Sequence, residues 1–552
     1  MRHLEQLQLP PILPPWLGLL LLLLALMPPR ADGQPADHGR TKPESYRDLA
    51  CDYYNKADYE NCISNCLKAI HQNPRDAWTY DIRALARGDK GDLDGAIADF
   101  RSALRLDPTY ANAYADCGWF FLHKKHDLRV ALADYNEAIR LDPTNVDDYV
   151  GRAEVYLAQT NFDQALNDYN TAIQLQPNNA EMFLDRGNAY RDHNELDRAL
   201  NDYNTAVQVN PTNEIGYFWR GHLLCDLTNY AAAELNYQAF TLSNPTSPAA
   251  WSYLGDFHER MTNYTSAIAD FTKCIQLEPT TSLYYSIRAS LQEESAKVFA
   301  RLGETNKQQE VLNQALRDHQ QAVTLNPEAL VGLGRFECRQ GHFDQGISDF
   351  TLFLQTHPAS YGGLTSRAYA YEIVANRMGT NGDVKGQQDA LAKALADWNQ
   401  LVSLKTQEQN SFQCLRGEYY SRNHQYASAL SDFHRAMELQ PNDYEAQSSL
   451  ARFLATCPDP AFRDGTNALT IAQKACASDH YDDGWSLATL AAAYAETGDF
   501  VQAVKWQNQA LVNLEAKDVY GDAFRAEMRD RLTLYEKGQP CRQPLGLDVF
   551  FE

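Results

Sequence analysis

Apolar and small residues recur at helical spacing through most of this chain. The segment after Pro143 carries Tyr149, Ala153 and Tyr156, which are four and three residues apart. Such spacing places the three side chains on one face of an α-helix. The next segment repeats the spacing with Ala165, Tyr169 and Ala172. A short turn at residues 160–163 separates the two segments, so we predict two antiparallel helices that form a hairpin.

Proline marks the end of each predicted hairpin at a nearly constant interval. The first seven of these prolines follow one another at about 34 residues, with one interval longer by a single position: Pro74, Pro108, Pro143, Pro177, Pro211, Pro245 and Pro279. Proline stops the second helix because it has no N–H. We expect Thr144, Asn178 and Thr212, each directly after a proline, to cap the next helix. A period of about 34 residues predicts stacked hairpins, because one hairpin cannot bury its own apolar face.

Small and aromatic residues recur in phase with these prolines. The small residues are Ala153, Gly187, Gly221 and Gly255 on the first helices, and Ala165, Ala199, Ala233 and Ala267 on the second. We expect them to let the two backbones approach closely, while rings such as Tyr169 and Tyr203 fill the space toward the next hairpin. This pattern resembles the tetratricopeptide-repeat (TPR) superfamily over nearly the whole chain after residue 43. The resemblance implies an all-α fold, a TPR-type right-handed α-solenoid of about 13 helical hairpins plus a C-terminal capping helix.

Two longer intervals interrupt the regular period. They run from Pro279 to Pro327 and from Pro358 to Thr406, which stands where a proline would. In each interval roughly 14 additional residues, divided between two helices, add about two turns to each helix and return the apolar stripe nearly to phase. We therefore predict elongated hairpins at 282–329 and 361–408. Their tips at 303–307 and 379–386 are candidate contact sites; the alternative is tolerated variation in a loop.

The closing part of the chain differs from the regular units. Residues 454–465 form a proline-containing connection longer than a standard turn, and residues 490–511 contain the last repeat. This pair of hairpins resembles the closing repeats of exported bacterial TPR proteins. The predicted parts are a signal peptide or short N-terminal anchor at 1–33, a linker at 34–42, seven regular units at 43–281, irregular units with two elongated hairpins at 282–408, C-terminal units at 409–516, a capping helix at 517–537 and a loose tail at 538–552.

One apolar run, from Trp16 to Met27, lies near the N-terminus. Twelve helical residues reach about 18 Å, which is short of the roughly 30 Å hydrocarbon core of a bilayer. Small residues at Ala31 and Gly33 fit cleavage before Gln34. We expect an exported protein, periplasmic or secreted; the alternative is a chain that stays anchored in the membrane by this segment.

The net charge of −23 limits the class of partner. Such a field repels phosphate backbones and anionic headgroups, which argues against nucleic acid or a bilayer surface as the main partner. The chain also lacks the phosphate-loop, nucleophile-elbow and His-Glu-x-x-His motifs. The acidic residues of 89–95 stand at the wrong offsets for a calcium loop. We therefore predict no catalytic residue, no cofactor, no metal and no small-molecule substrate.

The eleven cysteines leave two readings open. Cys457 and Cys476 lie on the paired helices of one hairpin, so they are a candidate disulfide in an exported chain. Others, such as Cys62, Cys66 and Cys274, occupy small buried positions of the repeat, where cysteine acts as a compact apolar residue.

The family resemblance implies a groove lined by the first helices, which holds an extended peptide or a partner helix. The candidate groove residues are Tyr54, Trp78, Asp81, Phe120, His123, Glu154, Asn188, Arg191, Phe218, His222, Asp256 and Glu259. The carboxylate clamp of chaperone-binding TPRs is not assembled, since Cys51 follows Arg47 and Leu184 precedes Asn188. Aromatic and acidic groove residues favour a basic or amphipathic partner segment. The alternative is that these side chains only solvate the groove or contact a neighbouring helix.

These observations favour one function and leave a second open. The first is a non-catalytic scaffold or adaptor that binds a peptide or helix of a partner protein. The alternative is an accessory subunit of an envelope enzyme or of a glycan-directed complex, which the elongated hairpins and the unusual C-terminal pair suggest.

Overall fold

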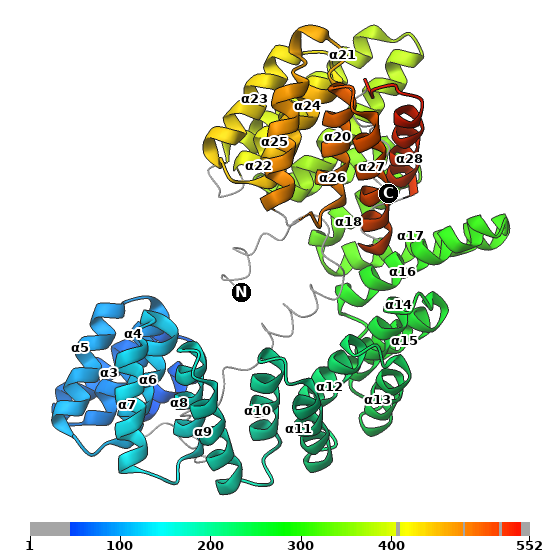
Figure 1. Ribbon diagram of the computed structural model, residues 1–552. Helices are drawn as coiled ribbons and strands as arrows, with labels where there is room; N and C mark the ends of the chain where they lie inside the picture. The colour runs from blue at the N-terminus through cyan, green and yellow to red at the C-terminus, as the bar shows by residue number, and fades with distance from the viewer. Residues whose placement is uncertain (1–44, 405–408, 479–480, 518–521, 543–552) are drawn as a thin grey trace. The chain divides into compact units, whose positions relative to one another are not determined.

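The computed structural model of the chain describes residues 45–404, 409–478, 481–517 and 522–542. It contains 27 α-helices, and these residues contain no β-strand. Consecutive helices pack in pairs as hairpins (Figure 1). The predicted all-α solenoid of about 13 hairpins with a closing helix is confirmed. The predicted signal peptide at 1–33 and linker at 34–42 lie outside the described residues.

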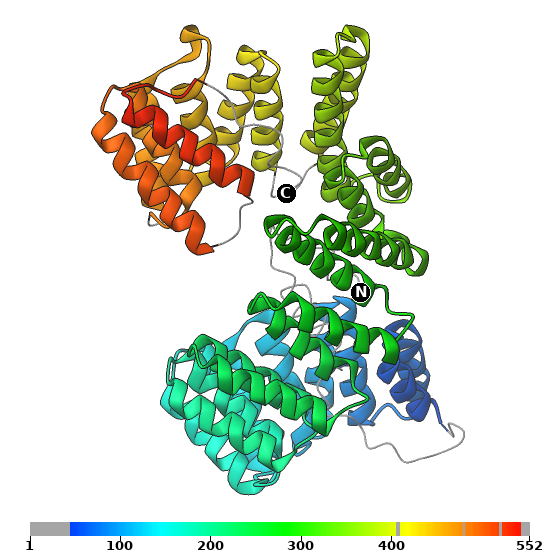
Figure 2. The same cartoon turned by 90° about the vertical axis from the view of Figure 1, so that its right-hand side faces the viewer.

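The described chain divides between Glu278 and Pro279 into two units. Unit 1 comprises residues 45–278 and consists of seven hairpins (Figure 2). Its first helices are α2 (Tyr46–Asn55), α4 (Ala77–Lys90), α6 (Ala111–Phe120), α8 (Val146–Ala158), α10 (Ala180–Asp192), α12 (Glu214–Asp226) and α14 (Pro248–Arg260). Its second helices are α3 (Tyr59–Gln72), α5 (Leu93–Leu106), α7 (Leu128–Leu141), α9 (Phe162–Leu175), α11 (Leu196–Val209), α13 (Tyr230–Ser243) and α15 (Tyr264–Leu277).

A tight turn centred on the proline joins consecutive hairpins of unit 1. Asp142, before Pro143, ends α7 outside the helical conformation, at φ −132° and ψ 89°, because a following proline disfavours the helical conformation. Pro143 and Thr144 form the centre of a turn that the Asn145 N–H closes by donating to the Asp142 carbonyl. The predicted caps are therefore wrong by one residue. The caps of α8, α10 and α12 are Asn145, Asn179 and Asn213, whose side chains accept backbone hydrogen bonds.

The turn inside each hairpin of unit 1 contains one residue with left-handed backbone. Their φ angles lie between +55° and +92°, and the residues are Ala57, Gly91, His126, Thr160, Asn194, Thr228 and Thr262. This conformation is unfavourable for residues with a Cβ atom. Five of these seven turns thus carry a cost that glycine would avoid, since Gly91 has no Cβ atom and asparagine tolerates the conformation at Asn194.

The single longer interval between the regular prolines, from Pro108 to Pro143, has a local structural cause. Helix α6 continues into a π-helix, η2 (Phe121–Lys125), which ends at the left-handed His126. A π turn holds one residue more than an α turn, so the helix absorbs the additional residue without a loop.

Aromatic rings of the second helices lie over the small residues of the first. A Cβ atom at Gly221 would stand 2.2 Å from the ring of Tyr237, and one at Gly187 would stand 2.7 Å from the ring of Tyr203. Both rings belong to the same hairpin as the glycine. The small residues therefore make room for a ring, whereas we had expected them to let the two backbones approach.

Unit 2 comprises residues 279–542 of the described chain. Its first helices are α16 (Ser282–Arg301), α18 (Leu330–Arg339), α20 (Tyr361–Thr380), α22 (Gln409–Arg422), α24 (Tyr444–Thr456) and α26 (Gly484–Glu496). Its second helices are α17 (Thr305–Leu325), α19 (Phe343–Thr356), α21 (Val384–Ser403), α23 (Tyr426–Leu439), α25 (Gly465–Ser478) and α27 (Phe500–Lys517), and α28 (Asp522–Glu536) packs on α27. Single 3₁₀ turns, η3 (Pro327–Ala329) and η4 (Pro460–Phe462), precede α18 and α25.

Two hairpins of unit 2 are longer than the others. Helices α16 and α17 have 20 and 21 residues, and α20 and α21 have 20 each, compared with 13 and 14 in α14 and α15. Each first helix has thus gained about two turns.

Candidate functional site

The candidate groove residues of unit 1 lie on its first helices. These helices contact one another in succession from α2 to α14. We use the name inner face for the surface formed by the side chains that they present along this row, including the twelve candidate groove residues.

Polar contacts join the inner face from α2 to α8. The Tyr54 hydroxyl donates to Asp89 at 3.2 Å, and the Lys124 ammonium lies 3.0 Å from the same carboxylate. Burial and then the charge of Asp89 raise the pKa of Tyr54. The His123 Nε2 lies 3.4 Å from a carboxylate oxygen of Glu154. The structure therefore brings these residues together as contacts between neighbouring helices.

Cations lie over aromatic rings at two places on the inner face. The guanidinium carbon of Arg47 lies 4.2 Å from the ring centre of Trp78, and that of Arg191 lies 4.2 Å from the ring centre of Trp219. Attraction between a cation and the ring face is worth about 0.5–1 kcal/mol at such sites. Asn188 is held from the core side, since its side-chain oxygen accepts from the Tyr203 hydroxyl at 2.7 Å.

A half-buried aromatic group continues the inner face on α12. The ring of Phe218 lies 4.4 Å from the His222 ring and 5.2 Å from the Tyr253 ring. Burial lowers the pKa of His222, so this ring is held in its neutral form near neutral pH.

Phe120 is a core residue, and its assignment to the groove was wrong. Its side chain is 1% exposed and its ring lies 5.5 Å from that of Phe100. The cause is the π-helix: counting back one regular period from Glu154 gives Phe120, but the additional residue makes Trp119 the equivalent position. Trp119 is half-buried and lies 5.0 Å from the His123 ring. The longer interval before Pro143 was the signal that could have identified Trp119.

Asp81 is a deeply buried carboxyl group of the inner face. It is 1% exposed, and neither of its carboxylate oxygens accepts a well-formed hydrogen bond within the described structure. Burial raises the pKa of Asp81 to about 7, although the adjacent Asp116 and Tyr110 side chains partly oppose this shift. Tyr110, at the start of α6, was not among the predicted residues.

Asp256 is a second carboxylate of this kind, on α14. Its side chain is half-buried, and within the described residues no ion pair joins it to a cation. Burial and then the charge of Glu259, one turn later, raise the pKa of Asp256 well above its usual value. The inner face thus holds buried or half-buried carboxyl groups without a cation at two separate places.

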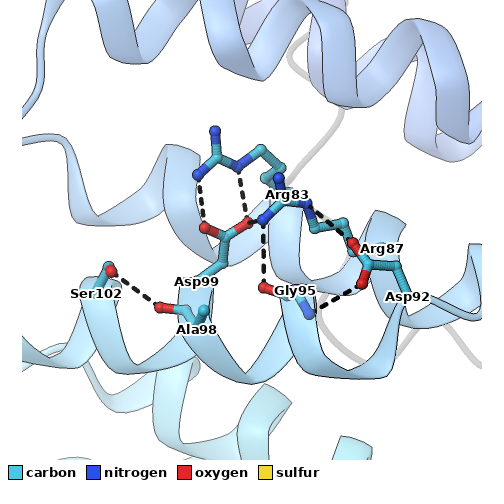
Figure 3. A network of polar contacts seen from close by, with 7 residues as sticks. All are labelled: Arg83, Arg87, Asp92, Gly95, Ala98, Asp99 and Ser102. Carbon is cyan, nitrogen blue, oxygen red and sulfur yellow. Dashed lines mark hydrogen bonds and ion pairs between the residues drawn. The ribbon is translucent and has the colours of Figure 1, made fainter.

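An arginine on the first helix fixes the helices beneath the inner face. In the hairpin of α4 and α5, Arg83 donates to both oxygens of Asp99 at 2.7 and 2.6 Å, and Arg87 donates to the same carboxylate at 2.8 Å (Figure 3). Arg87 also donates to the Gly95 carbonyl, while the Asp92 side chain accepts from the Gly95 N–H. Such charge-assisted, two-pronged bonds hold both helices in one register.

The same pairing recurs along the chain, and we call it the arginine ladder. Its pairs are Arg83 and Asp99, Arg152 and Asp168, Arg186 and Asp202, Arg288 and Asp318, Arg367 and Asp397, and Arg416 and Asp432. Arg186 also donates to Asn170 of the preceding hairpin at 2.6 Å, and Arg152 and Arg416 donate in the same way to Asn136 and Asn399 at 2.8 Å, so these arginines also tie one hairpin to its neighbour. The ladder is interrupted where Cys117 replaces the arginine, and burial then raises the pKa of Asp134 to about 6.

Unit 2 adds buried glutamates to this ladder. Glu372 on α20 accepts from Trp398 of its own hairpin at 3.1 Å and from Arg422 on α22 at 2.9 and 3.0 Å. Glu293 on α16 accepts in the same way from His319 and from Arg339 on α18. The two glutamates stand at equivalent positions of the two elongated hairpins, so each of these hairpins is tied to the next by one device.

The candidate disulfide is absent. Cys457 and Cys476 are both buried, and no bond joins their sulfur atoms. They pack in one apolar cluster of unit 2, which is the alternative role foreseen for cysteine. Burial raises the pKa of the Cys457 thiol and so lowers its reactivity.

The described part of the chain contains no cluster of three or more His, Cys, Asp or Glu side chains suited to a metal ion. None of its helices is long and apolar enough to span a membrane. Two open hollows of about 580 and 530 Å³ are lined by turns, one around Asn178 and Asn213 and the other around Thr160 and His193, and neither lies on the inner face.

Two family models match parts of unit 1. The model described as TPR repeat matches residues 84–119, 154–191 and 187–227. The model described as tetratricopeptide repeat matches residues 220–279. The matched residues lie between α4 and the end of α15, and residues 120–153 are not among them.

Similarity to curated proteins is confined to short stretches. The chain is 37% identical to serine/threonine-protein phosphatase 5 of Homo sapiens and 36% identical to that of Rattus norvegicus, each over 87 residues. Each match covers 16% of this chain and 17% of the phosphatase. The chain therefore spans about a sixth of the length of these relatives.

Solved structures with similar repeats cover larger parts of the chain. The C-terminal part of a TPR repeat-containing protein from Cytophaga hutchinsonii is 19% identical with a TM-score of 0.33, and the match covers 42% of this chain and 95% of that one. A thermophilic TPR protein of Thermus thermophilus is 19% identical with a TM-score of 0.29, covering 33% and 97%. YrrB, described as a TPR protein with an unusual peptide-binding site, is 22% identical with a TM-score of 0.25, covering 34% and 95%.

Proposed function

This chain belongs to the tetratricopeptide-repeat superfamily, and from that premise we propose that it is a non-catalytic scaffold or adaptor whose inner face in unit 1 binds a peptide or helix of a partner protein. The observation that carries the proposal is the composition of this face. It combines half-buried rings, such as Trp119 and Phe218, with the carboxylates of Asp81 and Asp256, which no cation of the described chain neutralises. Half-buried aromatic residues beside such charge are typical of protein interfaces.

The charges favour a basic or amphipathic partner segment. A cationic side chain in the partner would meet carboxylates that are already partly desolvated, where an ion pair gains more than it does in water. An acidic partner would be repelled, because the whole chain carries a net charge of −23.

The proposal is tested by truncating two rings of the inner face. The partner is first identified by crosslinking mass spectrometry in the native host, and its affinity is then measured for wild type and for the double variant Trp119→Ala and Phe218→Ala. We expect affinity to fall at least tenfold. The matched control is Leu235→Ala with Leu242→Ala, which removes side chains that are 67% and 82% exposed on the second helix α13. Equal affinities of both double variants would contradict the proposal.

We also propose that the chain is exported. The support is the apolar run from Trp16 to Met27, followed by small residues before Gln34. Ten of the eleven cysteine side chains are buried and Cys51 is half-exposed, so burial would protect most of them from oxidation in an oxidising compartment. N-terminal sequencing of the protein from the native host checks this, because export with cleavage predicts a chain that begins at Gln34.

A further inference from the structure

Two carboxylates lie together between α4 and α6 of unit 1. Asp81 is on α4 and Asp116 is on α6, and the Asp116 side chain is close enough to Asp81 to lower its pKa. Asp81 is buried beneath the inner face, while Asp116 is half-buried on this face. Tyr110 lies against both carboxylates, and burial raises its pKa, with further increases from Asp81 and Asp116.

Two carboxylates in one desolvated place cannot both stay ionised unless a cation joins them. In the free protein burial favours a proton on Asp81, whose pKa it raises to about 7. Neither oxygen of Asp81 accepts a well-formed hydrogen bond within the described structure. A buried charge without a partner costs free energy that a bound cation would recover.

The charged and titratable groups around Asp81 leave its charge uncompensated. Those that face it or its neighbours are Tyr110, Asp116 and Cys117 from the α6 side, and Arg47 and Tyr54 from α2. Arg47 is the cation among them, and it is engaged with the Trp78 ring and with Asp76 at 3.5 Å. Arg83, on the same helix as Asp81, is engaged with Asp99 of α5. The described groups therefore provide no cation for Asp81.

We infer that Asp81 and Asp116 form a subsite for a lysine or arginine side chain of the partner, and that the docking of this cation releases to solvent the proton that Asp81 holds. This inference rests on the proposed function, because it assigns one contact of the same inner face. The cation would bind at Asp116, which reaches the surface, and Asp81 behind it would add a second negative charge. No metal ion is needed, since the cation is covalently part of the partner.

The coupling between proton and cation gives the subsite a pH dependence. Below pH 7 a docking cation must displace a proton, so affinity rises by up to tenfold per pH unit as pH increases, and it levels off once the pair is ionised. The pH dependence distinguishes this subsite from general attraction by the acidic surface, whose carboxylates are already ionised above pH 5.

The experiment uses a fluorescein-labelled dodecapeptide of alternating Arg and Ala as the probe, with the full chain in about 150 mM NaCl, where long-range attraction is screened. We expect Asp116→Asn to weaken binding at pH 8 at least fivefold. The control Asp94→Asn removes an exposed carboxylate from α5, and we expect a change of less than twofold. Asp81→Asn should remove the rise in affinity between pH 5.5 and pH 7.

Each alternative outcome overturns the inference. Absence of measurable binding to wild type, equal effects of Asp116→Asn and Asp94→Asn, or an unchanged pH profile in Asp81→Asn would do so. The proposed function fails separately: a partner whose affinity depends on Trp119 and Phe218, but not on Asp116, would leave the inner face as the binding surface and remove only the cation subsite. Circular dichroism of each variant at both pH values checks that the helices are retained.

Discussion

In unit 2 a buried ion pair joins the first helices of successive hairpins, whereas in unit 1 half-buried contacts join them. Glu372 on α20 is 1% exposed and is bound by Arg422 on α22, and Glu418 on α22 is bound in turn by Arg452 on α24. The corresponding helices of unit 1 leave Asp81 and Asp256 without a cation among the described residues. On its first helices unit 2 therefore neutralises Glu372 and Glu418 internally, while unit 1 keeps carboxyl groups that a cation of a partner can pair with.

The turns inside the hairpins differ in the same direction. The left-handed position is held by glycine in four hairpins of unit 2, at Gly303, Gly341, Gly382 and Gly498. In unit 1 it is held by glycine at Gly91, and the other six turns carry side chains. Both differences predict that unit 2 is the more rigidly built part and that unit 1 has stability left to gain.

The largest expected effect comes from breaking a buried pair of unit 2. Glu372→Gln leaves the Arg422 guanidinium buried without its counter-charge, and such a loss costs about 3–5 kcal/mol. Urea titration followed by hydrogen exchange of α20 to α23 measures it. The control Glu438→Gln breaks an exposed pair with Arg435 and should cost less than about 0.5 kcal/mol. Similar losses for the two variants would remove the distinction between the units.

The arginine ladder is common to both units, so its loss should affect them alike. Arg186→Ala removes two bonds to Asp202 and one to Asn170, and we expect unit 1 to lose about 2–3 kcal/mol of unfolding free energy. Hydrogen exchange of α9 to α11 measures this loss. Arg367→Ala in unit 2 should cost a similar amount.

The matched control for the ladder is Arg220→Ala. Here Asn236 replaces the aspartate, so Arg220 binds a neutral acceptor at 2.6 Å. We expect a loss of about 1 kcal/mol. A loss as large as that of Arg186→Ala would show that packing, rather than the charge pair, carries the ladder.

The uncompensated charge of Asp81 in unit 1 predicts a stability that depends on pH. The pKa of Asp81 is raised to about 7 by burial, so the folded state holds a proton that the unfolded chain releases near pH 4. Stability is thus lost as pH rises from about 4 to 7. Asp81→Asn should leave stability at pH 4 nearly unchanged and raise it by about 1–3 kcal/mol at pH 8, measured by urea titration at both values.

If Asp81→Asn destabilised unit 1 equally at pH 4 and pH 8, the Asp81 carboxyl group would be serving as a structural hydrogen-bonding group in both protonation states. Asp94→Asn, on the exposed side of α5, is the control for a general charge effect.

The solenoid could be predicted from the sequence because its signal is repeated many times. Proline, small and aromatic residues each return once per hairpin, so a pattern that arose by chance in one unit would not recur in the next. The elongated hairpins could be anticipated for the same reason, since two additional turns in each helix preserve the helical phase. The residues of the inner face were less predictable. The additional residue in η2 shifts the repeat by one position, so Trp119 lies on the inner face and Phe120 lies in the core.

The polar contacts required the structure. The arginine ladder was visible as Arg152 and Arg186, and as Asp168 and Asp202, at the repeat period, yet the period alone does not show that these residues face each other. The clamp of Glu372 joins residues 50 positions apart across two hairpins, which no local pattern reveals. The pairing of Asp81 with Asp116 likewise depends on how α4 and α6 pack.

A substitution that converts one turn of unit 1 to the glycine turn found in unit 2 should have a small effect on stability. Thr228 has φ +56° and an exposed side chain, and its Cβ branch makes the left-handed backbone costly. Thr228→Gly removes this strain but adds flexibility to the unfolded chain, so we expect a net gain of about 0.5–1 kcal/mol, measured by urea titration. Asn194→Gly is the matched control at φ +63°, where asparagine already tolerates the conformation, and its gain should be near zero. A gain at Asn194 as large as that at Thr228 would mean that the turns of unit 1 respond to glycine generally, and the difference between the units would then concern flexibility instead of strain.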